Sequence, residues 1–195
     1  LTYAVTVLGV FAEEPKGANK PEWIERSDRV TQKLLEIRFD DQPEGGSQEG
    51  VTRYDREISV PTLANETTTM SRERALAVLI EASLKDEKDV RLAQDYQILL
   101  DSIRQDLDTR QYSEQHQVVF RDPHSLIQDG LSPLLDRQSS PERRQAALER
   151  IRKYAGLETG YQPICKVFRA RMQSQMDKPG MLYPCASEVE MALAR

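Results

Sequence analysis

The side chains best suited to bind a transition metal in this chain are two histidines, His116 and His124. A zinc site needs three or four His, Cys or carboxylate ligands, usually with two of them on one helix face. Between the two histidines lies Asp122-Pro123, a pair typical of the start of a new helix. We therefore expect His116 and His124 on different helices, in surface or capping roles, and predict no metal site in this chain.

Covalent catalysis needs a serine or cysteine beside a base. The sequence contains no GxSxG element, and neither Cys165 nor Cys185 has a histidine next to it in sequence. The glycines at Gly45-Gly46 and Gly50 lack the Lys-Ser/Thr ending of a phosphate-binding loop. The many carboxylates fall on charged helix faces, where solvation and ion pairing are their expected roles. We predict no catalytic residue in this chain.

The most unusual local string is YAGLETGYQP, which runs from Tyr154 to Pro163 between two predicted helices. Its binding candidates are Tyr154, Glu158 and Tyr161, because two aromatic rings and a carboxylate are groups that line ligand clefts. The alternative is a glycine C-cap followed by a tight connection, with the rings packed on the neighbouring helices. We favour this second interpretation.

The composition of the 195-residue chain is that of a folded protein. Hydrophobic residues make up 38% and charged residues 30%, which argues against a disordered chain. The net charge is −5, and basic residues are dispersed among acidic ones, so we exclude nucleic acid as a partner. No apolar run reaches the ~18 to 20 residues that cross a bilayer, and we predict no membrane span.

Residues 1–12, LTYAVTVLGVFA, form the longest apolar run, and acidic residues and Pro15 follow it. This pattern resembles the end of a signal peptide that is cleaved after Ala12, and residues 13–20 then form a flexible lead. A short buried strand or helix is the alternative. Export predicts a periplasmic or secreted protein, in which Cys165 and Cys185 could pair or remain free thiols.

Apolar periodicity predicts an all-α fold, an irregular multi-helix bundle of antiparallel helical hairpins. The first helix is expected over 21–39, and a Pro- and Gly-rich loop over 42–50 ends it. Residues 51–69 are expected to form an irregular connection. Ser71 is the predicted N-cap of the second helix, whose buried face consists of Leu76, Leu79, Ile80 and Leu84.

The third helix has the clearest spacing, and it should pair with the second as a hairpin. Its apolar stripe consists of Leu92, Tyr96, Leu99, Leu100, Ile103 and Leu107. Asp122-Pro123 predicts the start of a short helix over 123–128, which Gly130 ends. Ser140-Pro141 predicts the start of a longer helix, with Gly156 as its C-cap. Pro163 opens a further helix.

The last predicted helix begins at Ser187, where Ser187 and Glu190 match a capping box. Only eight residues follow Ser187 before the sequence ends at Arg195, and a helix that short is marginal by itself. We therefore expect residues 21–195 to be the helical N-terminal part of a larger domain that is truncated at its C-terminus.

Three stretches occur in a recognisable order: PEGGSQEGVTRYDREI, RLAQDYQILLDSI and GLSPLLDRQSSPERRQAALERIRKYAGLETGYQPI. Together they resemble the N-terminal half of the bacterial family catalogued as domain of unknown function 885. The shared features are a Gly-x-x-x-Tyr-Asp element, an Asp-x-x-Ile-Leu helix and an Arg-rich helix that ends in Tyr-x-Gly-Leu-x-x-Gly.

The resemblance implies a large, nearly all-helical, zincin-like protein, often exported, with its histidine-glutamate zinc motif downstream of the part that corresponds to this chain. No catalytic residue carries over. The expected function is the N-terminal segment of an exported zinc-dependent peptidase or related hydrolase, with zinc held by the C-terminal half, which would be its partner, and a peptide as substrate. The alternative is a non-enzymatic periplasmic binding or scaffolding module.

Overall fold

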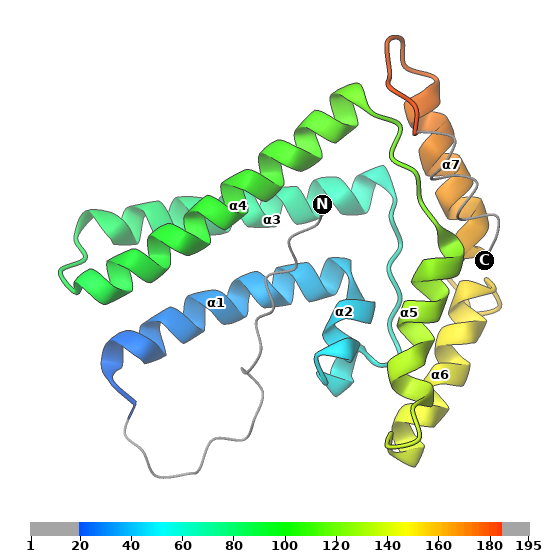
Figure 1. Cartoon of the computed structure of the whole chain (residues 1–195), viewed down its shortest axis with the longest axis horizontal. Helices are drawn as coiled ribbons and strands as arrows, with labels where there is room; N and C mark the ends of the chain where they lie inside the picture. The colour runs from blue at the N-terminus through cyan, green and yellow to red at the C-terminus, as the bar shows by residue number, and fades with distance from the viewer. Residues whose placement is uncertain (1–19, 185–195) are drawn as a thin grey trace.

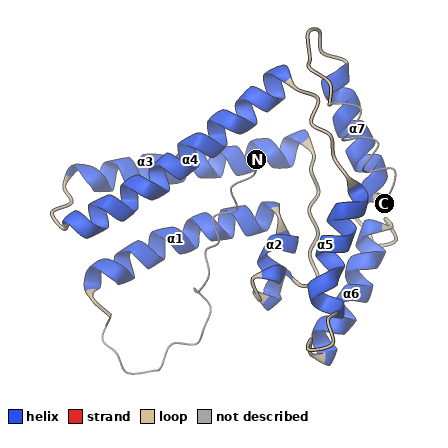
Figure 2. Cartoon of the chain, viewed as in Figure 1, coloured by secondary structure: helices blue, strands red, loops and turns tan. Residues whose placement is uncertain are grey.

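The computed structural model describes residues 20–184, and the predicted all-α fold is confirmed there (Figure 2). The described part contains seven α-helices, one 3₁₀-helix and a single isolated backbone bridge. The helices are α1 (Glu22–Asp41), α2 (Pro43–Gln48), η1 (Thr52–Tyr54), α3 (Leu63–Lys85), α4 (Val90–His116), α5 (Pro123–Leu135), α6 (Pro141–Tyr154) and α7 (Ile164–Met176). The predicted signal-peptide remnant, Cys185 and the predicted helix at Ser187 lie outside the described residues.

Helices α1, α3 and α4 form a three-helix unit around an apolar seam (Figure 1). The predicted hairpin of the second and third helices is confirmed, since α3 and α4 pack side by side and run in opposite directions. The buried apolar residues of this seam are Leu34, Ile37, Leu76, Ala77, Ile80, Leu92, Tyr96, Leu100, Ile103 and Leu107.

Helix α3 begins eight residues before the predicted N-cap. Thr62 is the cap, and its hydroxyl accepts a hydrogen bond from Asn65 N at 3.2 Å. The prediction of Ser71 was wrong: Ser71 lies inside the helix and its hydroxyl donates to Thr67 O at 2.8 Å. Such bonds to the preceding turn satisfy hydroxyls within a helix, so the threonine-rich stretch does not interrupt it.

The predicted buried face of α3 is confirmed at Leu76 and Ile80, and Leu84 packs against the same core. Leu79 was expected inside but is 59% exposed, whereas Ala77 is buried. The centre of the face is Glu73, which is fully buried between α1 and α4. A charged residue is seldom fully buried, so apolar spacing alone did not include Glu73 in the buried face.

The predicted loop over 42–50 was also wrong, because Pro43–Gln48 forms α2. Pro43 lies in the first turn, where a missing N–H costs no helical hydrogen bond. Glu44 and Ser47 are buried and bonded to other segments. These tertiary bonds outweigh the poor helix propensity of the two glycines.

Helix α5 begins as predicted, with the Asp122 carboxylate accepting from the amides of His124 and Ser125. It continues to Leu135, however, through Gly130 and Pro133. Gly130 was expected to end the helix, but it is buried against α6. A Cβ at this position would overlap the Tyr154 hydroxyl, so the glycine serves a close approach of two helices.

Helix α6 begins and ends as the sequence predicts. Ser140 accepts from Arg143 N, and Gly156 has φ +71°, the left-handed conformation of a glycine C-cap. The connection that follows leads to α7, which lies beside the first turns of α5 (Figure 1). No helix within residues 20–184 has both the length and the apolar character that a bilayer crossing needs.

Candidate functional site

A cleft of about 740 Å³ lies between the first half of α3, the last half of α4, and α7. Helices α3 and α4 diverge where α3 begins and α4 ends (Figure 1), and Arg171 of α7 bonds to both of them there. A stripe at helical spacing along α3 forms one wall, since Leu63, Thr67, Met70 and Arg74 all line it. The cleft is thus built where three segments distant in sequence converge.

The lining combines apolar and charged side chains. The apolar ones are Pro61, Leu63, Met70, Val119, Leu126 and Phe168, and the charged ones are Asp41, Glu66, Arg74, Arg110, Glu114, Arg121 and Arg171. An apolar concavity with a few placed polar groups is the usual form of a ligand site.

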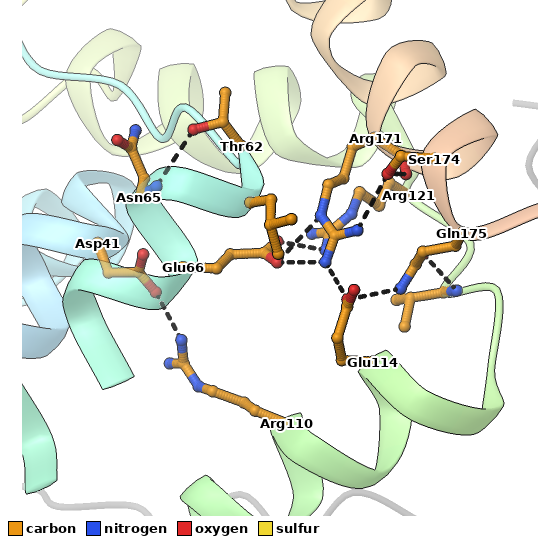
Figure 3. A network of polar contacts seen from close by, with 12 residues as sticks. Asp41, Thr62, Asn65, Glu66, Arg110, Glu114, Arg121, Arg171, Ser174 and Gln175 are labelled. Atoms are coloured by element: carbon orange, nitrogen blue, oxygen red, sulfur yellow. Dashed lines mark hydrogen bonds and ion pairs between the residues drawn. The ribbon is translucent and has the colours of Figure 1, made fainter. Parts of the chain in front are cut away.

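Glu66 is the meeting point of two guanidinium groups in this cleft (Figure 3). Arg171 donates to Glu66 Oε2 from Nε at 3.0 Å and from Nη2 at 2.6 Å, and Arg121 donates to Oε1 at 2.5 Å. Burial lowers the pKa of Arg121, and the nearby positive charge of Arg171 lowers it further. The two cations therefore lie close together and share one carboxylate.

Glu114, at the end of α4, binds the other side of Arg171 (Figure 3). It also accepts from Lys178. Burial acts to raise the pKa of Glu114, but the bonds from Arg171 and Lys178 outweigh it and lower that pKa. Gln175 Nε2 donates to the same carboxylate at 3.3 Å. This cleft network of Glu66, Glu114, Arg121, Arg171 and Lys178 ties α7 to the three-helix unit.

Two further arginines line the cleft. Arg110 pairs with Asp41 at 3.0 Å, so their charges cancel. Arg74 is exposed, and the described part of the chain offers it no carboxylate within ion-pair distance. Among residues 20–184, Arg74 is therefore a cation on the cleft wall whose guanidinium has no carboxylate partner.

A second polar cluster is buried beneath α2, and Glu44 is its centre. The Glu44 carboxylate accepts from Ser59 N at 3.0 Å, from the Ser59 hydroxyl, and from the Tyr154 hydroxyl at 2.6 Å. Burial, together with the charge of Glu44, raises the pKa of Tyr154 far above its ordinary value. The phenol therefore remains a proton donor and fixes α6 to α2.

Arg150 and Arg143 extend this buried polar network along α6. The fully buried Arg150 guanidinium donates to three backbone carbonyls, those of Tyr54, Glu57 and Gly130. Arg143 binds both oxygens of Asp55, at 2.9 and 3.0 Å. These bonds satisfy buried groups that would otherwise destabilise the fold.

The structure does not bring the three predicted binding residues to one cleft wall. Tyr154 is buried against Glu44, and Glu158 pairs with Arg152 at 2.5 Å. Tyr161 is half-buried, and the ammonium of Lys153 lies 4.9 Å from the centre of its ring. None of the three belongs to the lining of the cleft beside α3.

The two histidines and the described cysteine lie apart from the cleft lining. His116 ends α4 with its ring 4.8 Å from that of Tyr112, and His124 lies in the first turn of α5. Cys165 is exposed on α7. Over residues 20–184 there is no cluster of three or more His, Cys, Asp or Glu side chains arranged to hold a metal ion.

Sequence reasoning missed the cleft because its charged residues look like ordinary solvent-facing helix residues. Glu66, Glu114 and Arg171 come from three helices and are separated by dozens of positions. The one local hint is the position of Glu66 and Arg74 on the α3 stripe that also carries Leu63 and Met70.

No protein-family model matches this chain, and neither the curated proteins nor the solved structures contain a match.

Proposed function

We propose that this chain is a helical, peptide-holding segment of an exported zinc-dependent peptidase or related hydrolase and that it contributes no catalytic residue. In this proposal the protein is periplasmic or secreted, and a peptide lies in the cleft beside α3. The zinc ligands and the reacting groups belong to a C-terminal half, which packs against this segment.

The cleft is the observation that carries the proposal. It is large enough for several residues of an extended peptide, and it offers both an apolar wall and hydrogen-bonding groups. The apolar side chains Met70 and Phe168 can receive the side chains of a peptide. Thr67, Thr109 and Ser113 line the same cleft with hydroxyl groups that can bond to a peptide backbone.

The assignment to a hydrolase rests on the resemblance to the domain of unknown function 885 family. In the structure, residues from two of the resembling stretches meet in the buried polar network: Glu44 with Tyr154, and Asp55 with Arg143. These hydrogen bonds give the two stretches a structural role, which is compatible with a catalytic centre located elsewhere.

A non-enzymatic binding or scaffolding module is the second candidate. It is supported by the cleft, whose apolar wall and hydrogen-bonding groups can hold a ligand without any reacting group. The two candidates agree about the cleft and differ about the reaction.

The reaction is tested on the product of the whole gene. The gene is read beyond Arg195 for a histidine-glutamate motif, and the purified product is assayed for bound zinc and for release of amino acids from peptides, with and without a chelator. Zinc together with chelator-sensitive release supports the hydrolase. A zinc-free product that binds peptides but releases nothing identifies the binding module.

Peptide binding is tested on this chain by filling the cleft. Thr67→Trp places a large ring on the lining, whereas Thr68→Trp places the same ring on an exposed position of α3 outside it. We expect the first variant to lose affinity for peptides by at least about tenfold and the second to retain it. Equal binding by the two variants would remove the cleft from the proposal.

A further inference from the structure

We infer that the cleft selects acidic peptides, with Arg74 as the residue that recognises the carboxylate. The inference deepens the proposed function and rests on it, because it presupposes that a peptide occupies the cleft. It commits to carboxylate side chains flanked by apolar ones.

The charge balance of the cleft lining favours an acidic ligand. Arg110 and Asp41 cancel each other, and Arg121 and Arg171 face the two carboxylates of Glu66 and Glu114. Arg74 adds a further positive charge. The site is therefore positive in a protein whose net charge is −5, and a concave site concentrates such a field.

Arg74 differs from the other arginines of the cleft lining in its ion pairs within residues 20–184. The other three lining arginines each hold a carboxylate of the protein, and Arg171 holds two (Figure 3). Arg74 holds none among the described residues, although Arg72, two positions away on the same helix, pairs with Asp40 at 2.8 Å. A guanidinium binds a carboxylate through two parallel hydrogen bonds, a geometry that favours an acidic ligand.

An apolar residue, Met70, lines the cleft next to Arg74. Met70 is one turn earlier on α3, and both residues line the cleft. A carboxylate that reaches Arg74 therefore brings the adjacent ligand residue to Met70, where an apolar side chain is favoured. Because Arg74 is exposed, this ion pair should be modest in strength and sensitive to salt.

The test measures binding of three peptides, blocked at both ends, to the whole chain. The sequences are Ala-Glu-Leu-Glu-Ala and the same peptide with Gln or Lys in place of both Glu residues. At an ionic strength of about 20 mM we expect the Glu peptide to bind about fivefold more tightly than the Gln peptide, and the Lys peptide to bind most weakly. At about 0.5 M salt the difference should largely disappear.

Arg74→Gln should lower the affinity for the Glu peptide to that for the Gln peptide and leave the Gln peptide unaffected. Arg72→Gln is the matched control, because it removes an exposed arginine from the same helix outside the cleft lining. This control should preserve the preference for the Glu peptide. Because both side chains are exposed, both variants should fold, which circular dichroism verifies.

Each contrary result has its own meaning. Equal affinities for the Glu and Gln peptides, or an equal loss in Arg72→Gln and Arg74→Gln, would overturn the acidic selectivity and leave the peptide-holding function intact. Failure of all three peptides to bind would instead count against the proposed function itself.

Discussion

The three-helix unit and the layer of α2, α5 and α6 bury different chemistry. Between α1, α3 and α4, ten buried apolar side chains form one seam. Between α2, α5 and α6, the fully buried Arg150 donates to backbone carbonyls, and the buried Tyr154 hydroxyl donates to the Glu44 carboxylate. The first packing tolerates changes of shape, whereas the second requires every partner to be present.

The largest effect is expected for Arg150→Met, which leaves three backbone carbonyls without their donor. Unsatisfied buried acceptors should lower the free energy of unfolding by about 4 kcal/mol. Urea denaturation followed by circular dichroism measures this loss. Arg144→Met, an exposed change on the same helix, should alter stability little. If the two variants were equally stable, the polar layer would not depend on its arginine.

Ile103→Ala probes the apolar seam. Ile103 is fully buried in α4, and its truncation should cost about 3 kcal/mol through lost burial and the cavity left behind. Trp23, the only tryptophan of the chain, packs on this seam and reports its unfolding by fluorescence. Ile98→Ala removes the same atoms from a 60% exposed position of α4 and should cost far less. A similar cost for both would mean that the seam is misplaced.

Gly130→Ala tests the close approach of α5 to α6. The added methyl group would collide with the Tyr154 hydroxyl and displace its bond to Glu44, at a cost of about 2 kcal/mol in thermal or urea unfolding. Gly45→Ala is the control, because a methyl group there meets no other atom within 4 Å. It should be neutral or slightly stabilising. Destabilisation by Gly45→Ala alone would contradict this account.

Glu73→Gln should produce the smallest change, and it should stabilise the protein. Neither oxygen of the buried Glu73 carboxyl accepts a hydrogen bond within the described residues, and Arg38 Nε is 3.9 Å away. Burial raises the pKa of Glu73 above its ordinary value, despite the opposing charges of Arg110 and Arg38. The neutral glutamine avoids the cost of ionising this site and should add roughly 1 kcal/mol at neutral pH.

The sign of the pH dependence follows from the raised pKa. The folded protein holds the Glu73 proton more tightly than the unfolded chain does. The contribution of this protonated carboxyl to the free energy of unfolding is therefore complete below the unfolded pKa of Glu73, and it is lost as pH rises through the folded pKa. Stability measured across this window should fall in the wild type and remain more nearly level in Glu73→Gln. Glu81→Gln, at an exposed ion pair on α3, should leave the slope unchanged.

Most helices could be predicted from local signals. The apolar spacing from Leu92 to Leu107 predicted α4, and the caps at Asp122, Ser140 and Gly156 predicted ends of α5 and α6. These signals act within one or two turns of a helix, so the neighbouring sequence is sufficient to read them. The same logic failed for α2 and for the first turns of α3, where glycines and threonines are typical of loops.

Only the tertiary structure decided the contacts between residues far apart in the chain. The Glu44–Tyr154 bond joins residues 110 positions apart, and the cleft network joins Glu66 to an arginine on α7. Single-sequence patterns show which residues can be buried in a helix, but they contain no information about which distant charge will meet which. Most helices could therefore be predicted from the sequence, whereas the buried polar network and the cleft arise from how the helices pack.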